Sequence, residues 1–397
     1  MKRGDLSFGL ITSDDEFDGL AGEWAGLLAD SPADPLFCSF PWMRAWWGVY
    51  RDLGELRIAC ARDETGRLVG IAPLYRRVMT ARELEKEMVG DVRVIVGTKG
   101  GAYKVLSPVG NGEACSDFLG FIAQNGRVDE IWSELYLYLH KHVRGFDIFN
   151  LTDACESTPG IEALQYAAMA GRHTRYRAIY GAPYAVLPGG YEEYLNTLSK
   201  KSRYNARKKL KEIRIYHKVE HYFHDDPATL DSAMDAFFAL HAERWQADGK
   251  IGVFEKPSMN AFHKAMAREG LARGWLRLGF MNIDGEPVFA TYAYHVGDRV
   301  YLYQQGSTTK YPEFNLGYAA LAFAIADACE RGAKFYDFLR GDAEYKLHWA
   351  KNSRRLVQFL AFRSLRASRF YARSFINTDP KVRETVKRII RRGRPEK

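Results

Sequence analysis

The segment from Arg299 to Trp349 constrains the fold more than any other part of the sequence. It begins with an alternating aromatic strand, RVYLYQQGS, and passes through the turn NLGY into an apolar helix over 317–331. A short apolar strand over 334–339 follows and stops at Gly341. The order strand, turn, helix, strand predicts a mixed α/β unit.

Polar side chains gather directly after this last strand. They are Arg340, Asp342, Lys346, His348 and Trp349. Cations, a carboxylate and an aromatic ring within ten residues predict a pocket for a polar ligand. The alternative is structural: Arg340 and Asp342 would form an ion pair that closes the strand end, and Trp349 would belong to the core.

The rest of the chain also mixes strands with helices. Helices are predicted over 14–29, 41–50, 130–143, 191–210, 230–245 and 258–273, and strands over 6–11, 56–77, 89–110, 146–153, 184–188, 220–224 and 276–307. Both halves contain helices followed by a hairpin with a glycine turn and then a further helix and strand. This repeated order predicts two similar domains, each a mixed, mainly antiparallel sheet flanked by helices.

Length supports the same division. At 397 residues the chain is longer than one hydrophobic core usually serves. We expect an N-terminal domain over 1–180, a C-terminal domain over 181–362 and a basic tail over 363–397.

The net charge of +8 is unevenly distributed. Residues 363–397 hold twelve Lys or Arg against three Asp or Glu, so the body of the chain is close to neutral. Within the body, 200–218 carries nine basic residues and only one acidic one. Charge concentrated in this way suits a phosphate-bearing ligand or an anionic surface.

Cysteine usage and hydropathy predict a cytoplasmic protein. The five cysteines are scattered without a CxxC pair, as expected for reduced thiols. The first residues lack the apolar run of a signal peptide, and no apolar run approaches the ~18 residues that span a bilayer. We expect no metal site, because His217, His221 and His224 lack a completing ligand set.

Four segments also occur in a recognisable order: PLFCSFPWMRAWWGVY, LSKKSRYNARKKL, GYAALAFAIADACERGAKFYDFLRGD and YKLHW. Together they resemble the BioF2-like branch of the GNAT acyltransferases, often labelled CelD/BcsL. That branch is associated with exopolysaccharide synthesis and is related to the Fem aminoacyltransferases. The resemblance implies two tandem GNAT-like domains, the second an acetyltransferase that moves an acyl group from acetyl-CoA to an amine or hydroxyl of a sugar or exopolysaccharide precursor.

The resemblance further implies that amides at a helix N-terminus bind the acyl-CoA pyrophosphate. A helix start attracts anions because its first N–H groups lack partners. The candidates for cofactor binding are Gly306, Asn315, Gly317 and Tyr318. The basic glycine-rich loop usual in the superfamily is absent, so a plain capped core helix is the alternative.

Catalytic roles follow from the same resemblance. Lys346 matches the Phe-Lys motif of the Fem enzymes and is expected to stabilise a carbonyl or phosphate. Asp342 is the candidate to orient or deprotonate the acceptor, and Arg340 supplies a further cation. The candidates for substrate binding are Arg203, Asn205, Arg207, Tyr303 and Trp349. Arg203 and Arg207 lie one helical turn apart, where a phosphate can dock; the alternative is a solvated basic helix.

Two other functions stay open. One is Fem-like aminoacyl transfer from tRNA, with the basic segment 200–218 gripping RNA. The other is a non-catalytic scaffold on the inner face of the cell membrane, held by an amphipathic helix in the tail whose apolar face is formed by Val382, Val386, Ile389 and Ile390. A frayed soluble tail is the alternative for that helix. The enzyme hypothesis requires the N-terminus of the helix at 317 and the cations after 339 to converge on one cleft.

Overall fold

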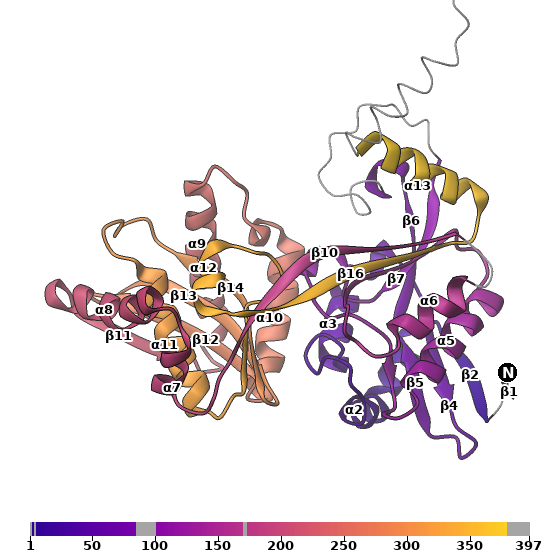
Figure 1. The fold of residues 1–397 in the computed structure, drawn as a ribbon, viewed down its shortest axis with the longest axis horizontal. Helices are drawn as coiled ribbons and strands as arrows, with labels where there is room; N and C mark the ends of the chain where they lie inside the picture. The colour runs from indigo at the N-terminus through magenta and orange to yellow at the C-terminus, as the bar shows by residue number, and fades with distance from the viewer. Residues whose placement is uncertain (1, 4, 85–100, 170–172, 379–397) are drawn as a thin grey trace, which may run out of the picture.

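The computed structural model describes residues 2–3, 5–84, 101–169 and 173–378. They form two lobes that lie side by side (Figure 1). The long strands β10 (His173–Val186) and β16 (Asn352–Phe362) pair antiparallel and run from one lobe into the other. The mixed α/β class predicted from the sequence is confirmed.

The N-terminal lobe carries a small sheet and several helices. Ser13 and Glu16 form a capping box at the first helix, and Ser39 caps the third. The helix predicted over 14–29 is two helices, because the chain makes a tight turn at Leu20, whose N–H donates to Phe17 O (3.0 Å). The helices are α1 (Asp14–Gly19), α2 (Ala21–Ala29), α3 (Phe40–Tyr50), α5 (Val128–His142) and α6 (Ile161–Met169).

The helix predicted over 191–210 is also divided. The chain is extended at Leu198 and Ser199, and the Ser199 hydroxyl accepts a hydrogen bond from the N–H of Ser202 (3.1 Å) to start a new helix. The helices after β10 are α7 (Tyr191–Thr197), α8 (Lys200–Tyr216), α9 (Leu230–Ala247), α10 (Pro257–Ala272), α11 (Leu316–Glu330), α12 (Glu344–Trp349) and α13 (Leu365–Thr378).

Strands of both lobes form one mixed sheet. Its eleven strands are ordered β11-β12-β13-β14-β15-β10-β16-β9-β7-β6-β3, and a five-stranded sheet in the N-terminal lobe is ordered β1-β2-β4-β5-β8. The remaining strands are β1 (Lys2–Arg3), β2 (Leu6–Ile11), β3 (Gly54–Leu56), β4 (Ile58–Arg62), β5 (Leu68–Ala72), β6 (Leu74–Met79), β7 (Tyr103–Pro108), β8 (Ile122–Ala123), β9 (Ile148–Cys155), β11 (Val219–Phe223), β12 (Leu276–Ile283), β13 (Glu286–Val296), β14 (Arg299–Ser307) and β15 (Phe335–Asp337). Residues 89–100 of the predicted strands over 89–110 lie outside the described residues.

The last strand returns to the N-terminal lobe. The second half of β16, from Leu356 to Phe362, pairs with β9, while β10 pairs with β15 at its other end through Tyr184 to Val186. The predicted boundary at 180/181 therefore falls inside β10, a strand that both lobes use. Helix α13 then packs on the N-terminal lobe, with the ring of Phe370 4.9 Å from that of Tyr103.

An aromatic cluster joins the lobes. Trp42 of α3 packs against Phe262 of α10 and Tyr294 of β13, with ring centroids 5.1 and 6.0 Å away. Its indole N–H donates to the hydroxyl of Ser116 (2.8 Å), which in turn donates to Gly110 O (2.6 Å). Because Trp42 and Tyr294 are fully buried, the lobes share a packed interface.

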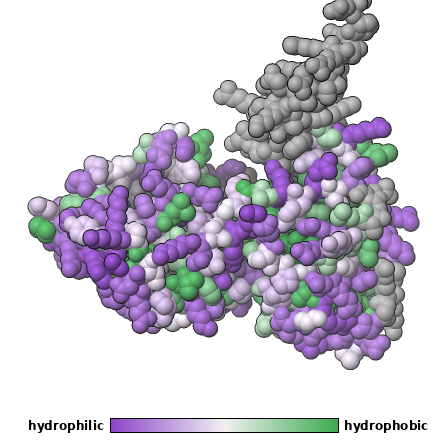
Figure 2. Space-filling view, in the orientation of Figure 1, coloured by the Kyte–Doolittle hydropathy of each residue, from purple (hydrophilic) through white to green (hydrophobic). Residues whose placement is uncertain are grey.

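The visible surface is mostly hydrophilic, and its hydrophobic residues are scattered (Figure 2). None of the helices within the described ranges combines the length and the apolar character needed to cross a bilayer. The apolar tail residues Val382, Val386, Ile389 and Ile390 lie outside the described residues.

Candidate functional site

The large sheet opens between β14 and β15. These parallel strands pair only from Arg299 to Tyr301, because β15 stops at Asp337 while β14 continues to Ser307. Among the described residues the end of β14 therefore has no partner strand on this side. The candidate site lies at this opening.

A cavity of 760 Å³ lies there. Its lining includes the end of β14 through Gln305 and Gly306, the start of α11 and one face of α12. Of the predicted site residues, the cavity brings together Gly306, Asn315, Gly317, Tyr318 and Trp349. Its size is that of a ligand pocket rather than a packing defect.

The N-terminus of α11 faces this cavity. Asn315 caps the helix, its side-chain oxygen accepting a hydrogen bond from the N–H of Tyr318 (3.3 Å). Within the described chain the N–H groups of Leu316 and Gly317 have no hydrogen-bond acceptor. Two unpaired amides at a helix start form an anion site, because the macrodipole adds partial positive charge there.

Other cavity residues were not singled out as site residues from the sequence. Lys209 on α8 and Arg244 on α9 also line it, and each forms an ion pair, Lys209 with Glu212 (2.8 Å) and Arg244 with Asp248 (2.8 Å). The amide oxygen of Gln305 is buried without a hydrogen-bond partner among the described residues, so it can accept a hydrogen bond from a ligand. Gln305 was difficult to predict as a site residue from the sequence, because it lies in a strand whose pattern is typical of the hydrophobic core.

Gly306 has a second reason to be glycine. A Cβ atom at this position would lie 2.5 Å from the backbone nitrogen of His241, where α9 crosses β14. The absence of a side chain therefore allows a helix and a strand to pack closely. At Gly317, in contrast, the nearest side-chain atom to an added Cβ is 3.6 Å away, on Phe289.

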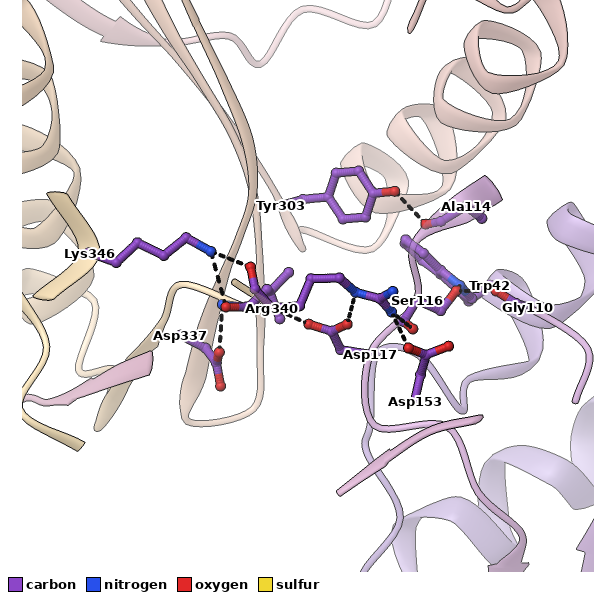
Figure 3. Close-up of polar contacts among 11 residues, drawn as sticks. Trp42, Gly110, Ala114, Ser116, Asp117, Asp153, Tyr303, Asp337, Arg340 and Lys346 are labelled. Carbon is purple, nitrogen blue, oxygen red and sulfur yellow. Dashed lines mark hydrogen bonds and ion pairs between the residues drawn. The ribbon is translucent and has the colours of Figure 1, made fainter. Parts of the chain in front are cut away.

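Lys346 is held inside the protein. It lies on α12, is only 8% exposed, and its ammonium donates hydrogen bonds to the carbonyl oxygens of Leu339 (3.1 Å) and Arg340 (Figure 3). Burial lowers the pKa of Lys346 from 10.5 to about 8, because a charged amine is less stable away from water. Both protonation states are therefore accessible near neutral pH.

Arg340 does not line the cavity. Its backbone N–H and its guanidinium both donate to the buried carboxylate of Asp117, and the guanidinium also contacts Ser116 O and the carboxylate of Asp153 (3.1 Å). The structural alternative, an ion pair between Arg340 and Asp342, is therefore not formed. Arg340 pairs instead with two carboxylates of the N-terminal lobe, which are buried and would be destabilised without a cation. Figure 3 shows this junction between the lobes.

Asp342 and Tyr303 also lie outside the cavity at α11. Asp342 lines a different cavity of 580 Å³ beside β10 and β16. The buried hydroxyl of Tyr303 donates to Ala114 O at the lobe interface. The expected single cleft is therefore corrected: α12 brings Trp349 to the start of α11, but Arg340, Asp342 and Lys346 point elsewhere.

The predicted basic face of α8 is not part of the cavity lining either. Arg207 pairs with Glu192, and Arg203 donates weakly to Asn196 O (3.5 Å). Asn205 is half-buried and lies outside the lining as well. Of this helix, Lys209 reaches the cavity. Among the side chains that the structure describes, no three His, Cys, Asp or Glu gather as a metal site.

Comparisons with known proteins agree with this location. Residues 200–347 match the model of the acetyltransferase (GNAT) domain. The crystal structure of FemX resembles the whole fold, with 12% identity, a TM-score of 0.58, and coverage of 93% of this chain and all of FemX. A conserved protein of unknown function from Bacteroides thetaiotaomicron gives 12% identity, a TM-score of 0.55 and coverage of 89% and 100%. No curated protein matches the sequence.

These findings confirm two predictions. The likeness to FemX confirms the expected fold. The domain match confirms an acyltransferase of the GNAT type, and the matched segment contains nearly the entire cavity lining, from Lys209 to Tyr345.

Proposed function

We propose that the protein transfers an acyl group, acetyl from acetyl-CoA, to an amine or hydroxyl of a sugar or exopolysaccharide precursor, as in the BioF2-like branch. The observation that carries the donor assignment is the 760 Å³ cavity at the start of α11. All of its lining residues except His348 and Trp349 belong to the segment that matches the GNAT domain.

The residues present fit a CoA thioester. The free N–H groups of Leu316 and Gly317 would hold the pyrophosphate. At the edge, Lys209 and Arg244 would exchange their carboxylate partners, Glu212 and Asp248, for phosphate. The orphaned oxygen of Gln305 would accept a hydrogen bond from an amide N–H of the donor. Acetyl-CoA supplies the activated acyl group.

Lys346 is the proposed electrophilic group, although it lies outside the cavity lining, between the lining residues Tyr345 and His348 of α12. Its ammonium is fixed by two backbone carbonyls and retains a third N–H for the oxygen on which negative charge develops during acyl transfer. Transfer is direct, without an acyl-enzyme. Burial raises the pKa of the Cys38 and Cys60 thiols to about 12, so neither is an activated nucleophile.

Calorimetric titration with CoA and acetyl-CoA tests the donor site. Lys209→Ala and Arg244→Ala should each weaken binding by about tenfold, which corresponds to ~1.4 kcal/mol. Lys211→Ala is the matched control, because Lys211 is an exposed cation of the same helix outside the cavity lining. Absence of CoA and acetyl-CoA binding at millimolar concentration would discard the donor assignment.

Aminoacyl transfer from charged tRNA is the second candidate. Two observations favour it: the likeness to FemX and the exposed cations of α8, among them Lys200, Lys201 and Lys211, next to the cavity. Phosphate binding by such a patch falls steeply as salt rises. Measurable tRNA affinity with that dependence supports this candidate, and its absence removes it.

A further inference from the structure

A second cavity lies where the chain crosses between the lobes. It has a volume of 580 Å³ and is bounded by β10, by β16 and by the loop that carries Asp342. We refer to it as the crossing groove. Its lining shares no residue with that of the cavity at α11.

Asp342 is placed in this groove by a glycine. The N–H of Gly341 donates to Gly181 O (2.8 Å), which fixes the loop against β10. A Cβ atom on Gly181 would lie only 2.2 Å from a carboxylate oxygen of Asp342, so the carboxylate lies directly over the strand. Asp342 is exposed, and within the described residues its side chain has no hydrogen bond or ion pair.

An aromatic residue also lines this groove. Tyr180, next to Gly181 in β10, is 49% exposed, and the guanidinium of Arg340 is 5.5 Å from its ring centroid. The ion pair with Asp117 holds the Arg340 guanidinium in place. One part of the Tyr180 ring therefore contacts a fixed cation, and the rest of the ring faces solvent. The groove is completed by Arg355 and Glu156, which pair at 3.3 Å.

The groove adjoins the proposed electrophile. The ammonium of Lys346 donates to Arg340 O and lies 3.8 Å from the position of a Cβ on Gly341. Gly341 directly precedes Asp342 in the chain. The ammonium of Lys346 therefore lies beside the loop that carries Asp342.

We propose that the crossing groove binds the acceptor and that the acceptor is an amino sugar. A free carboxylate pairs with its ammonium, the ring of Tyr180 packs against its apolar C–H face, and Arg355 and Glu156 hydrogen-bond to its hydroxyls. This proposal rests on the proposed acyl transfer. Asp342 then has the role of positioning the amine and taking its proton.

The reaction balances with these groups. The acceptor ammonium gives one proton to Asp342, which passes it to water. Its nitrogen then forms a bond to the acyl carbon as the bond between that carbon and sulfur breaks. The second proton lost by the nitrogen reaches the leaving thiolate through solvent, so the products are an amide and a free thiol. No oxidant or further reactant is needed.

Ligand-observed NMR with D-glucosamine tests the groove on the full-length protein without any donor. Tyr180→Ala and Gly181→Ala should weaken glucosamine binding at least tenfold, the second by displacing the Asp342 carboxylate without removing its charge. The matched controls are Tyr166→Ala, a tyrosine that is 75% exposed on α6, and Gly9→Ala, where an added Cβ meets nothing within 4 Å. Both controls should change the affinity less than twofold.

D-glucose, which lacks the amino group, tests whether the ammonium of glucosamine contributes to binding. It should bind at least tenfold more weakly than glucosamine to the unchanged protein, and Asp342→Asn should remove most of that difference. The inference is overturned if glucosamine does not bind at 10 mM or if the controls weaken it as much as the groove variants do. Calorimetric titration of the same variants with CoA distinguishes the two proposals. If glucosamine does not bind in the groove but CoA still binds, only the groove proposal is overturned.

Discussion

The carboxylate of Asp117 holds Arg340 by two hydrogen bonds, one from the backbone N–H (2.7 Å) and one from the guanidinium. The two residues are 223 positions apart and come from different lobes. Since Arg340 O in turn accepts a hydrogen bond from Lys346, the N-terminal lobe determines where the lysine ammonium lies.

Backbone strain is concentrated at this junction. Five non-glycine residues of the described chain have positive φ, and four of them lie here: Cys115, Phe118, Asp153 and Leu339. Each such conformation costs of order 1 kcal/mol or more and persists only where the surroundings enforce it. Two of these residues contact the network directly: Asp153 pairs with Arg340, and Leu339 O accepts a hydrogen bond from Lys346.

Loss of the Asp117 carboxylate should destabilise the protein strongly. Asp117→Ala leaves Arg340 partly buried without its main partner, which costs about 3–5 kcal/mol. Urea denaturation measures the change. Asp231→Ala is the control, because the Asp231–Arg268 pair is about half exposed and should contribute less than about 1 kcal/mol. Equal effects of the two variants would contradict a structural role for the junction.

The rate of acyl transfer should fall as pH rises through about 8. Burial lowers the pKa of Lys346 to about 8, and only the protonated amine stabilises the developing oxyanion. A pH profile of kcat shows this descending limb. Lys346→Arg keeps a cation and should remove the limb below pH 10, whereas Lys346→Met should lower kcat by about 10²–10³. A limb that persists in Lys346→Arg belongs to another group.

Asp117→Asn should shift that limb. The negative charge of Asp117 favours the protonated form of Lys346, so its removal lowers the pKa of the amine further. The descending limb of kcat should therefore move to lower pH. Asp231→Asn is again the control and should leave the limb in place. If the limb does not move in Asp117→Asn, the charge of Asp117 at the lobe interface does not influence the pKa of the group that controls kcat.

Two glycines should respond differently to alanine. Gly306→Ala places a methyl group against the backbone of α9 and should destabilise the fold by about 1–3 kcal/mol. Gly317→Ala fits beside Phe289 and should leave stability nearly unchanged, but it crowds the anion site at the start of α11. Thermal denaturation and CoA titration on both variants check this. Unaltered CoA affinity in Gly317→Ala would place the donor elsewhere.

Regular elements with local signals could be predicted from the sequence. Helix α11 is capped by Asn315 as expected, and the strands over 276–307 follow the predicted meander. Strand β16 was missed because its pattern changes along its length. Its first residues, Asn352 to Arg355, are largely exposed, whereas those from Leu356 onward are buried on both faces. Neither a period of two nor a uniform apolar run describes such a strand.

The candidate site could be predicted only where it is local. Asn315 and Gly317 lie next to each other in the sequence and in the cavity. The partner of Arg340 could not be found in this way, because Asp117 lies in a distant loop whose sequence carries no charge pattern pointing to it. From the sequence, Asp342 was the nearest candidate partner of Arg340. In the structure Arg340 pairs instead with Asp117, whose carboxylate is buried.

A crystal structure with a non-hydrolysable thioether analogue of acetyl-CoA tests the central claim most directly. The account predicts that the pyrophosphate accepts hydrogen bonds from the N–H groups of Leu316 and Gly317, with the acyl end directed along the end of β14 towards α12. A pyrophosphate bound away from α11, or an acyl end pointing out of the 760 Å³ cavity, would contradict it.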